Sequence, residues 1–436
     1  MFERLALVRR NARDRVDLKR LVDECRQILG VRGESNSVAI AALAVERCGR
    51  LSSDGIHQFF QALADEFNPD PGEVLSLAER YAVSRTPENL IRLSQAAEAP
   101  RQELFRRLNR APGATAMLVH LRARLLERLK QDKKLMAVDS DLEHLLSSWF
   151  NPGFLQMVQV DWRSPAALLE RIIHHEAVHA IDGWNDLRRR LEPDRRCFAF
   201  FHPALPDEPL IFVEVALVPT MPNAIAPLLD RAAESVLAPD KYRVAVFYSI
   251  SNCQPGLRGI NLGNFLIKRV AEHLAREFPK LKAFCTLSPI PSLAAWLAKV
   301  DTIGDASLKL NQSKKLNDSL KTLRQKHGHD LSGLMAGVAP IERDLEPLMR
   351  LAAYYLAFRS GAGESQNNAD PVARFHLHNG ARLERINPQA DLSRKGLKQS
   401  FGLMVNYLYD LEEIESNHER FVDGDVNASK PVHALI

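Results

Sequence analysis

Apolar and polar positions divide the chain into two regions that follow different periods. In residues 1–148, apolar side chains recur at three- and four-residue spacing, which is the period of an amphipathic helix. One example is the run Ile56, Phe59 and Leu63, which follows Ser52, a residue type that favours the N-cap of a helix. Similar segments, separated by proline and glycine, fill the rest of this region and predict a bundle of helices.

Further along, the pattern is that of strands alternating with helices. Runs of β-branched and aromatic residues, bounded by Pro, Asp or Gly, predict strands at 209–219, 242–251 and 281–291. Residues 262–274, between the last two runs, return to helical spacing and predict an amphipathic helix. The polar, basic stretch 305–333 is typical of a solvated helix or a mobile insertion, and a phosphate-binding role is the less favoured alternative.

These two patterns predict an α+β protein with two domains. An all-helical bundle over residues 1–148 comes first, and an α/β domain occupies residues 149–436. The length of 436 residues supports this division, since a single hydrophobic core rarely grows beyond about 250–300 residues. The hydrophobic share of 46% and the charged share of 26% are those of a globular chain rather than of a disordered one.

Charge, apolar-run length and cysteine spacing exclude several classes of protein. A net charge of +4 is too small for a general nucleic-acid binder, although it suits a polyanionic small ligand. No segment approaches about 18 uninterrupted apolar residues, so we expect no membrane span. The Arg-rich N-terminus contains Glu3 and Asp14, unlike a transit peptide, and is expected to begin the first helix. The five cysteines include no CxxC pair and predict reduced thiols in a cytoplasmic compartment, with the mitochondrial matrix as the alternative.

A histidine-rich segment spells the pattern of a zinc protease. His175 and His179 are four residues apart with Glu176 beside the first, so on a helix two imidazoles would share one face with a general base. A catalytic zinc site needs a third protein ligand, which the extended protease pattern places at residue 185. Asn185 stands there, and Asp182 stands where that pattern has glycine. We therefore expect no metal site and no zinc metallohydrolase, and we place Glu176 and His179 on a helix of the second domain.

Three glycines lie within eight residues between a predicted strand and the helix after it, at Gly256, Gly259 and Gly263. Glycine lets the backbone come close to a ligand, and the first amides of a helix are unpaired donors at the positive end of its dipole. Arg258 and Lys268 add positive charge to this segment. The loop therefore predicts a site for a pyrophosphate group.

The same loop resembles the acyl-CoA loop of the N-acetyltransferase superfamily, in which Arg/Gln-x-x-Gly-x-Gly/Ala cradles the pyrophosphate. Residues 258–263 match except at Asn261, where glycine is expected, and this departure disfavours an ordinary acetyltransferase. The whole chain more closely resembles the malonyl-CoA decarboxylase family. Four segments carry that resemblance in the family's order, namely 247–270 (FYSISNCQPGLRGINLGNFLIKRV), 287–297 (LSPIPSLAAWL), 370–387 (DPVARFHLHNGARLERIN) and 402–413 (GLMVNYLYDLEE).

This resemblance implies a fold, an activity and a set of site residues. Members of the family have a helical domain used in self-association and a catalytic domain of acetyltransferase-like fold with a mixed sheet. They are carboxy-lyases that convert malonyl-CoA to acetyl-CoA and carbon dioxide without a metal or an organic cofactor. We therefore expect malonyl-CoA as the substrate and a homo-oligomer, dimer or tetramer, formed through the helical domain. The family's catalytic pair falls on Ser288 and His376, and its malonyl-CoA loop falls on Arg258, Gly259, Ile260, Asn261, Leu262, Gly263 and Asn264.

The chemistry of decarboxylation asks for such groups independently. Loss of carbon dioxide leaves an enolate on the thioester, and donors aimed at its oxygen stabilise that charge. Ser288 is expected to hold the departing carboxylate or to accept a proton from the exchange. His376 is expected to give the carbanion its proton at near-neutral pH. Tyr409 and Ser249 are the supporting candidates, as hydroxyl groups that can hydrogen bond to the pair or to the thioester. Tyr407 is expected to face the other side of the strand that carries Tyr409.

Several alternatives stay open at this point. A Ser–His pair also serves covalent acyl transfer, although decarboxylation needs no acyl-enzyme. An acyl-CoA-dependent N-acetyltransferase would share the loop without needing Ser288 and His376 together, and a non-catalytic acyl-CoA sensor would use the helical half as its output. Apart from the family, Ser288 has the pattern of a capping hydroxyl before proline, and His376 that of a hydrogen-bonded core histidine.

Overall fold

The computed structural model describes residues 2–30, 36–230, 237–260, 262, 266–304, 308–335, 342–359 and 369–436. The contacts divide the chain into two compact units. Unit 1 comprises Met1–Gln156, Phe201–Leu210 and Asn252–Leu262, and unit 2 comprises Met157–Phe200, Ile211–Ser251 and Gly263–Ile436. The division into domains 1–148 and 149–436 stays a prediction. One later segment of unit 1, Asn252–Leu262, contains the start of the glycine-rich loop.

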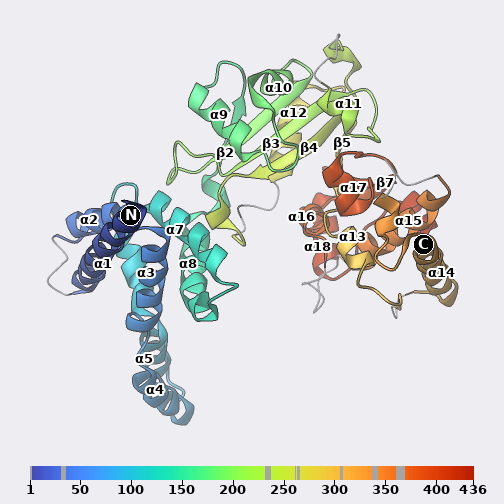
Figure 1. Ribbon diagram of the computed structural model, residues 1–436. Helices are drawn as coiled ribbons and strands as arrows, with labels where there is room; N and C mark the ends of the chain where they lie inside the picture. Colours follow the sequence, from blue (N-terminus) through green and yellow to red (C-terminus); the bar gives the residue numbers. More distant parts are fainter. Residues whose placement is uncertain are drawn as a thin grey trace. The chain divides into compact units, whose positions relative to one another are not determined.

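Unit 1 is built from helices around one apolar core (Figure 1). The run predicted to be helical forms α3, in which Phe59 is 2% exposed and Leu63 is fully buried. Ser52 caps α3 by accepting a hydrogen bond from the amide of Gly55. The prediction of an all-helical N-terminal region is confirmed by α1 (Phe2–Leu29), α2 (Ser37–Arg50), α3 (Ser53–Glu66), α4 (Pro71–Val83), α5 (Pro87–Ala97), α6 (Pro100–Leu108), α7 (Ala114–Arg128), the short 3-10 turn η2 (Lys133–Leu135) and α8 (Met136–Trp149). Unit 1 also contains the later 3-10 turns η3 (Pro152–Phe154) and η5 (Pro255–Leu257).

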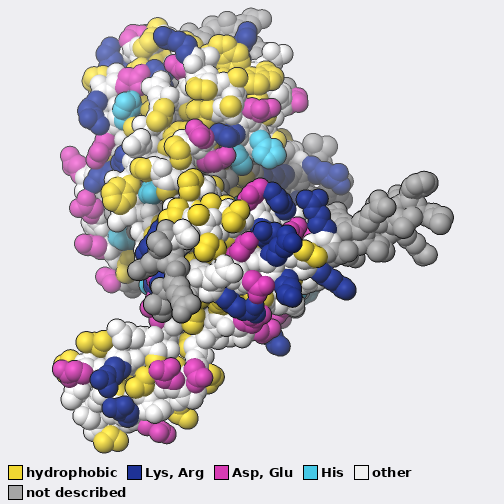
Figure 2. Space-filling model, turned by 90° about the vertical axis from the view of Figure 1, so that its left-hand side faces the viewer, with side chains coloured by type: hydrophobic (Ala, Val, Ile, Leu, Met, Phe, Trp, Pro, Cys, Tyr) yellow, Lys and Arg dark blue, Asp and Glu magenta, His cyan; other side chains and the backbone are white. Residues whose placement is uncertain are grey.

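Helices α4 and α5 differ from the other helices of unit 1 because neither contains a buried residue. The two helices pack against each other, and the hairpin they form extends away from the remaining helices of the unit (Figure 1). Leu75, Val83 and Ile91 are 62%, 91% and 56% exposed. Figure 2 shows hydrophobic side chains among charged ones on the lower lobe that this hairpin forms.

A mixed, eight-stranded sheet runs through unit 2, and its strands follow the order β1-β2-β3-β4-β5-β8-β6, with β7 also paired to β8. Strands β4 and β5 are parallel, whereas β2 and β3 are antiparallel. The strands are β1 (Gln156–Val160), β2 (Arg195–Phe201), β3 (Ile211–Val218), β4 (Val244–Asn252), β5 (Ala283–Thr286), β6 (Ser288–Pro289), β7 (Arg382–Asn387) and β8 (Met404–Tyr409). The three strands predicted from the sequence are therefore confirmed as β3, β4 and the β5–β6 pair, and the mixed sheet is confirmed with them.

Strand β8 joins the parts of the sheet that carry the candidate site. It pairs antiparallel with β5, through Tyr409 and Phe284, and with β6, through Val405 and Ser288. It also pairs antiparallel with β7, where Val405 lies opposite Ile386. Residues on these four strands are therefore fixed relative to one another by backbone hydrogen bonds.

Helices form much of the rest of unit 2. The basic stretch forms α14 (Leu310–His327), whose Leu316, Leu320 and Leu323 are buried, so this segment is a helix with one packed face. The other helices are α9 (Ala166–His175), α10 (Gly183–Arg190), α11 (Ala226–Leu229), η4 (Pro239–Lys241), α12 (Leu266–Glu277), α13 (Leu293–Leu297), η6 (Ser332–Met335), α15 (Glu342–Phe358), α16 (Pro371–His378), α17 (Arg394–Ser400), α18 (Ile414–Val422) and α19 (Lys430–Leu435). Within the described residues, none of these helices is both long and apolar enough to cross a bilayer.

Candidate functional site

Ser288 and His376, which lie far apart in the sequence, meet inside unit 2. Ser288 begins β6, and His376 lies in the last turn of α16. The distance between Ser288 Oγ and His376 Nε2 is 3.0 Å, which is a hydrogen bond. Ser288 is 5% exposed and His376 is 4% exposed, so the pair is buried. The structure therefore brings together the two residues that the sequence nominated as a pair.

Two tyrosines of β8 complete the surroundings of the histidine. The hydroxyl of Tyr409 lies 2.8 Å from His376 Nδ1, so Tyr409 bonds to the pair directly. The ring of Tyr407 stacks on the imidazole, with 4.7 Å between centroids and 27° between planes. The expectation that Tyr407 faces the other side is wrong, because residues two apart on a strand share a face. Both tyrosines therefore restrict the orientation of His376.

A threonine that the sequence reading overlooked gives the hydrogen bonds a direction. Ser288 Oγ donates to Thr286 Oγ1 over 2.9 Å, and that oxygen also accepts from the amide of Tyr407 at 3.2 Å. A serine hydroxyl has one hydrogen, so Ser288 accepts from His376 Nε2–H when it donates to Thr286. His376 Nδ1 is then the acceptor of the Tyr409 hydroxyl. The chain of donors thus runs from Tyr409 through His376 and Ser288 to Thr286.

Burial determines the charge states of His376 and Tyr409. Desolvation lowers the pKa of His376 to about 3, because an imidazolium ion is poorly solvated in an apolar interior. Desolvation likewise raises the pKa of Tyr409 well above its usual value. At neutral pH both groups are therefore uncharged, and each can serve as a hydrogen-bond donor without carrying a net charge.

Asp370 ties the helix of the histidine to the loop of the serine. Its Oδ1 caps α16 by accepting from the amides of Val372 and Ala373, at 3.0 and 3.1 Å. Its Oδ2 accepts from the amide of Ser292 at 3.0 Å, four residues after Ser288. The side chain is fully buried, which raises the pKa of Asp370 to about 6 despite these three hydrogen bonds. The cap is a local feature, because aspartate is a favoured N-cap residue and Pro371 is suited to the first position of a helix. The bond to Ser292 depends on tertiary packing.

Ser249, the other supporting candidate, bonds to a different partner. Its Oγ lies 2.7 Å from both carboxylate oxygens of Glu176, and Ser251 Oγ donates to the same carboxylate at 3.2 Å. Ser249 lies two residues after Phe247, which pairs with Thr286 across β4 and β5, so both face the same side of the sheet. The ring of Phe247 is 6.3 Å from that of Tyr409. Ser249 is thus on the face of the sheet that carries the pair, held there by Glu176.

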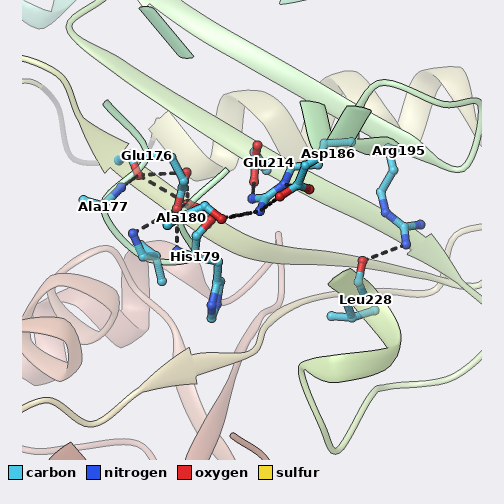
Figure 3. Close-up of polar contacts among 12 residues, drawn as sticks. Glu176, Ala177, His179, Ala180, Asp186, Arg195, Glu214 and Leu228 are labelled. Carbon is cyan, nitrogen blue, oxygen red and sulfur yellow. Dashed lines mark hydrogen bonds and ion pairs between the residues drawn. The ribbon is translucent and has the colours of Figure 1, made fainter. Parts of the chain in front are cut away.

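The segment with the zinc-protease spelling is not a helix across its whole length. Helix α9 ends at His175, and Glu176 has extended backbone angles. Glu176 Oε1 accepts from the amides of Val178 and His179, at 2.9 and 2.7 Å, so the carboxylate caps the loop rather than a continuing helix. The expectation that Glu176 and His179 share a helix is therefore wrong, and the imidazole of His179 points away from Glu176 (Figure 3).

This loop is held on every side. Arg190 Nη2 donates to the carbonyl oxygens of His179 and Ala180, at 2.9 and 3.3 Å (Figure 3). Lys395 Nζ donates to the carbonyl oxygens of Ala177 and Val178, at 3.0 and 3.1 Å. Arg190 itself is ion-paired with Asp186 and with the fully enclosed Glu214, whose pKa burial raises to about 7. The loop therefore presents Glu176 to Ser249 in a fixed position.

Potential cofactor ligands are scarce in the part of the chain that the structure describes. There, no group of three or more His, Cys, Asp and Glu side chains is arranged to hold a metal ion. The five cysteines are buried and free of disulfides. The absence of a metal or organic cofactor stays a prediction.

The structure describes part of the predicted malonyl-CoA loop. Asn261, Gly263 and Asn264 lie outside the described residues. Ile260 and Leu262 are 8% and 5% exposed, so their side chains point into the protein. Of the two predicted positive charges, Arg258 directly follows the 3-10 turn η5. Lys268 lies on α12 and forms an ion pair with Glu415 at 2.8 Å. Gly259 has φ +86°, a conformation that favours glycine.

Comparisons with known proteins identify a family over most of the chain. Residues 153–436 match the family model for the malonyl-CoA decarboxylase C-terminal domain, and residues 67–150 match that for the N-terminal domain. The mitochondrial malonyl-CoA decarboxylase of Rattus norvegicus is 38% identical over 355 residues, covering 76% of this chain and 70% of the relative. That of Anser anser anser is 36% identical over 400 residues, covering 86% and 78%.

Solved structures give the same result for the fold. The crystal structure of malonyl-CoA decarboxylase from Rhodopseudomonas palustris superposes with a TM-score of 0.84 at 44% identity, covering 96% of this chain and 99% of that one. The structure from Agrobacterium vitis superposes with a TM-score of 0.79 at 46% identity, covering 95% and 99%. The acetyltransferase-like character of the second domain stays a prediction.

The buried histidine predicts a specific loss of stability in acid. Its pKa is about 3 in the folded protein and near 6.5 when unfolded, so below pH 6.5 the unfolded state binds a proton that the native state does not. The free energy of unfolding therefore carries no penalty from His376 above pH 6.5. It decreases as the pH falls below that value, because the unfolded state gains a proton that the native state does not bind. We expect the wild type to lose about 2 kcal/mol of unfolding free energy between pH 7 and pH 5 that His376→Asn retains.

Urea unfolding at the two pH values measures this difference. His329→Asn is the matched control, because that histidine side chain is 66% exposed and its replacement removes no buried imidazole. If the wild type and His376→Asn lose the same unfolding free energy between pH 7 and pH 5, burial does not hold His376 in its neutral form.

Proposed function

We propose that this chain, which belongs to the malonyl-CoA decarboxylase family, is a carboxy-lyase that converts malonyl-CoA to acetyl-CoA and carbon dioxide. The observation that carries the proposal is the buried chain of hydrogen bonds from Tyr409 through His376 to Ser288. A buried histidine between two hydroxyl groups can deliver a proton and can orient a carboxylate, and both tasks are needed here.

Each residue of this hydrogen-bonded series has its own task in the proposed reaction. The bond between the carboxylate carbon and Cα breaks, carbon dioxide leaves, and the electron pair passes into the thioester as an enolate. Ser288 turns its hydroxyl hydrogen from Thr286 to the carboxylate and holds that group before it leaves. His376 then donates its Nε2 proton to Cα. Because the imidazole is neutral, it takes the proton of the Tyr409 hydroxyl at Nδ1 as it gives up the one at Nε2. The negative charge then lies on the phenolate oxygen of Tyr409, and a proton from water restores the tyrosine after each turnover.

Ser249 has a supporting role in this proposal. Its hydroxyl lies on the same face of the sheet as the pair, and Glu176 fixes it there with two contacts of 2.7 Å. The single hydrogen of this hydroxyl goes to Glu176, so Ser249 donates to the thioester oxygen only when substrate binding turns that hydrogen away from the carboxylate, and it then stabilises the developing charge. The loop from Arg258 to Asn264 is proposed to bind the pyrophosphate of CoA.

Assembly and location are proposals as well. We propose a homo-oligomer, a dimer or a tetramer, formed through the helical domain, because the α4–α5 hairpin exposes apolar residues that are unusual on a solvated surface. No nucleic acid is proposed as a partner. The relatives from rat and goose are named as mitochondrial, so the mitochondrial matrix stands beside the cytoplasm as a proposed location.

The central prediction concerns turnover. Ser288→Ala and His376→Asn should each lower kcat by about 10² to 10⁴-fold, because the lost interaction exists mainly in the transition state. Both variants should still bind acetyl-CoA. The double variant should be little worse than the poorer single one, since the two residues act as a unit.

Steady-state decarboxylation of malonyl-CoA, with carbon dioxide as the measured product, tests this prediction. The same assay distinguishes the proposal from acyl transfer to an amine and from a sensor without catalysis. Retention of more than about a tenth of the turnover in His376→Asn would exclude that histidine as the proton donor. Tyr409→Phe is then the next variant.

A second prediction concerns metal. We expect purified protein to contain no stoichiometric zinc, because the His175–His179 spelling is interrupted by the end of α9. Metal analysis and activity in the presence of a chelator test this. One tightly bound zinc per chain, with activity lost on its removal, would contradict the prediction.

A third prediction concerns assembly. Leu75→Glu combined with Ile91→Glu should reduce the assembly to smaller species, because charges on the hairpin would be buried in a subunit contact at high cost. Light scattering measures the mass. Leu43→Glu is the control, since Leu43 is 50% exposed on α2, outside the hairpin. An unchanged mass in the double variant would place the subunit contact elsewhere.

A further inference from the structure

The start of the glycine-rich loop is packed against the helices of unit 1. The segment Asn252–Leu262 belongs to the same compact unit as helices α1–α8. The turn η5 (Pro255–Leu257) lies on α7, and this is among the most extensive contacts between elements in the unit. The helical region therefore shapes the beginning of the loop that we propose to bind CoA.

One arginine makes the polar part of this contact. Arg122, on α7, is 1% exposed. Its Nη1 donates to the carbonyl oxygens of Gly256 and Arg258, at 2.9 and 2.7 Å. Both carbonyls belong to the loop, so a single guanidinium nitrogen fixes two of its peptide planes. Hydrogen bonds from a charged donor are about twice as strong as neutral ones, which makes this an effective clamp.

The guanidinium is itself held in place by α8. Arg122 Nε donates to Asp139 at 2.9 Å, and Nη2 lies 3.5 Å from Glu143. A buried cation is costly unless it is paired and its donors are satisfied. Arg122 therefore has one favourable position, defined by the α8 carboxylates on one side and the loop carbonyls on the other.

The glycines of the loop fit the same packing. A Cβ atom on Gly256 would lie 1.9 Å from the carbonyl oxygen of Val119, and one on Gly259 would lie 2.8 Å from Glu143 Oε1. Gly259 also has φ +86°, which strains any other residue. Gly256, predicted to let a pyrophosphate approach, is therefore also required for close contact with the backbone of α7. At Gly259 the positive φ is the restriction, because Glu143 can move its carboxylate aside.

We propose that Arg122 is a positioning residue for the substrate: it fixes residues 256–258, the start of the loop that we propose to bind the CoA portion. This inference rests on the proposed function of that loop. It gives the helical region a second task beside self-association, which is to set the affinity for the acyl-CoA. The chemical step, carried by residues of unit 2, does not depend on this clamp.

The experiment compares Arg122→Lys with Arg101→Lys in the full-length protein. Lysine keeps the positive charge but lacks the planar fork that reaches a carboxylate and two carbonyls together. Arg101 is the matched control, because it is 4% exposed and pairs with Asp141 on α8, while its other acceptors lie at residues 67 and 68. KM and kcat for malonyl-CoA, Kd for acetyl-CoA by calorimetry, and Tm are measured for both.

We expect both variants to lower Tm and only Arg122→Lys to raise KM and the acetyl-CoA Kd, each by about tenfold, with kcat within about twofold of wild type. Equal changes of KM in the two variants would overturn the proposal, because they would reflect the loss of any buried arginine. A reduced kcat with unchanged KM would overturn it too. If Arg122→Lys does not fold, Asp139→Asn replaces it, because this variant removes one carboxylate that holds the same guanidinium. An unchanged acetyl-CoA Kd in Asp139→Asn would also overturn the proposal.

The binding measurement also separates this inference from the proposed function. A wild-type protein that binds acetyl-CoA but does not decarboxylate malonyl-CoA contradicts the proposed function alone. The ratio of Kd values between Arg122→Lys and wild type then still decides the role of Arg122. A wild-type protein that binds no CoA thioester contradicts both.

Discussion

The backbone pairing of β8 is the constraint on which the candidate site depends. One strand of six residues pairs with β5, β6 and β7, and so sets the positions of Ser288, Thr286 and the two tyrosines. Side chains that must meet within 3 Å need supports that do not move, and a ladder of backbone hydrogen bonds supplies one. Only His376 comes from outside the sheet. Asp370 compensates for this by bonding α16 to the segment that follows the serine.

Burial has two opposite consequences for this arrangement. It lowers the pKa of His376 and so removes the charged form that histidine usually offers as an acid. It also leaves the hydrogen bonds within the site unscreened, which strengthens each of them. A neutral imidazole can still act as a donor to a strong base such as a carbanion, provided that a second donor follows it. The Tyr409 hydroxyl on Nδ1 satisfies that condition, so its position supports proton donation by His376 as much as the Ser–His hydrogen bond does.

The sequence predicted the local features well and the long-range ones poorly. Helical spacing around Phe59 and β-branched runs at β3 and β4 report on backbone conformation, which is decided within a few residues. The cap at Asp370 is of the same kind. In contrast, Thr286, Glu176 and the stacking of Tyr407 have no local signal, because their partners come from distant segments. The desolvation of His376 is likewise a property of the packed fold rather than of the histidine's neighbours in sequence.

The glycine-rich loop shows why a motif can be identified correctly and its residues explained incompletely. Glycines between a strand and a helix suggest a ligand, since the same lack of a side chain lets a phosphate approach the backbone. At Gly256 the lack of a side chain also admits the backbone of α7, and at Gly259 it allows a positive φ. A residue that meets two demands is doubly restricted, and a substitution there disturbs the loop even if the ligand never touches it. Within the described part of the loop, Arg122 donates to backbone carbonyls, so these hydrogen bonds do not require any particular loop side chain.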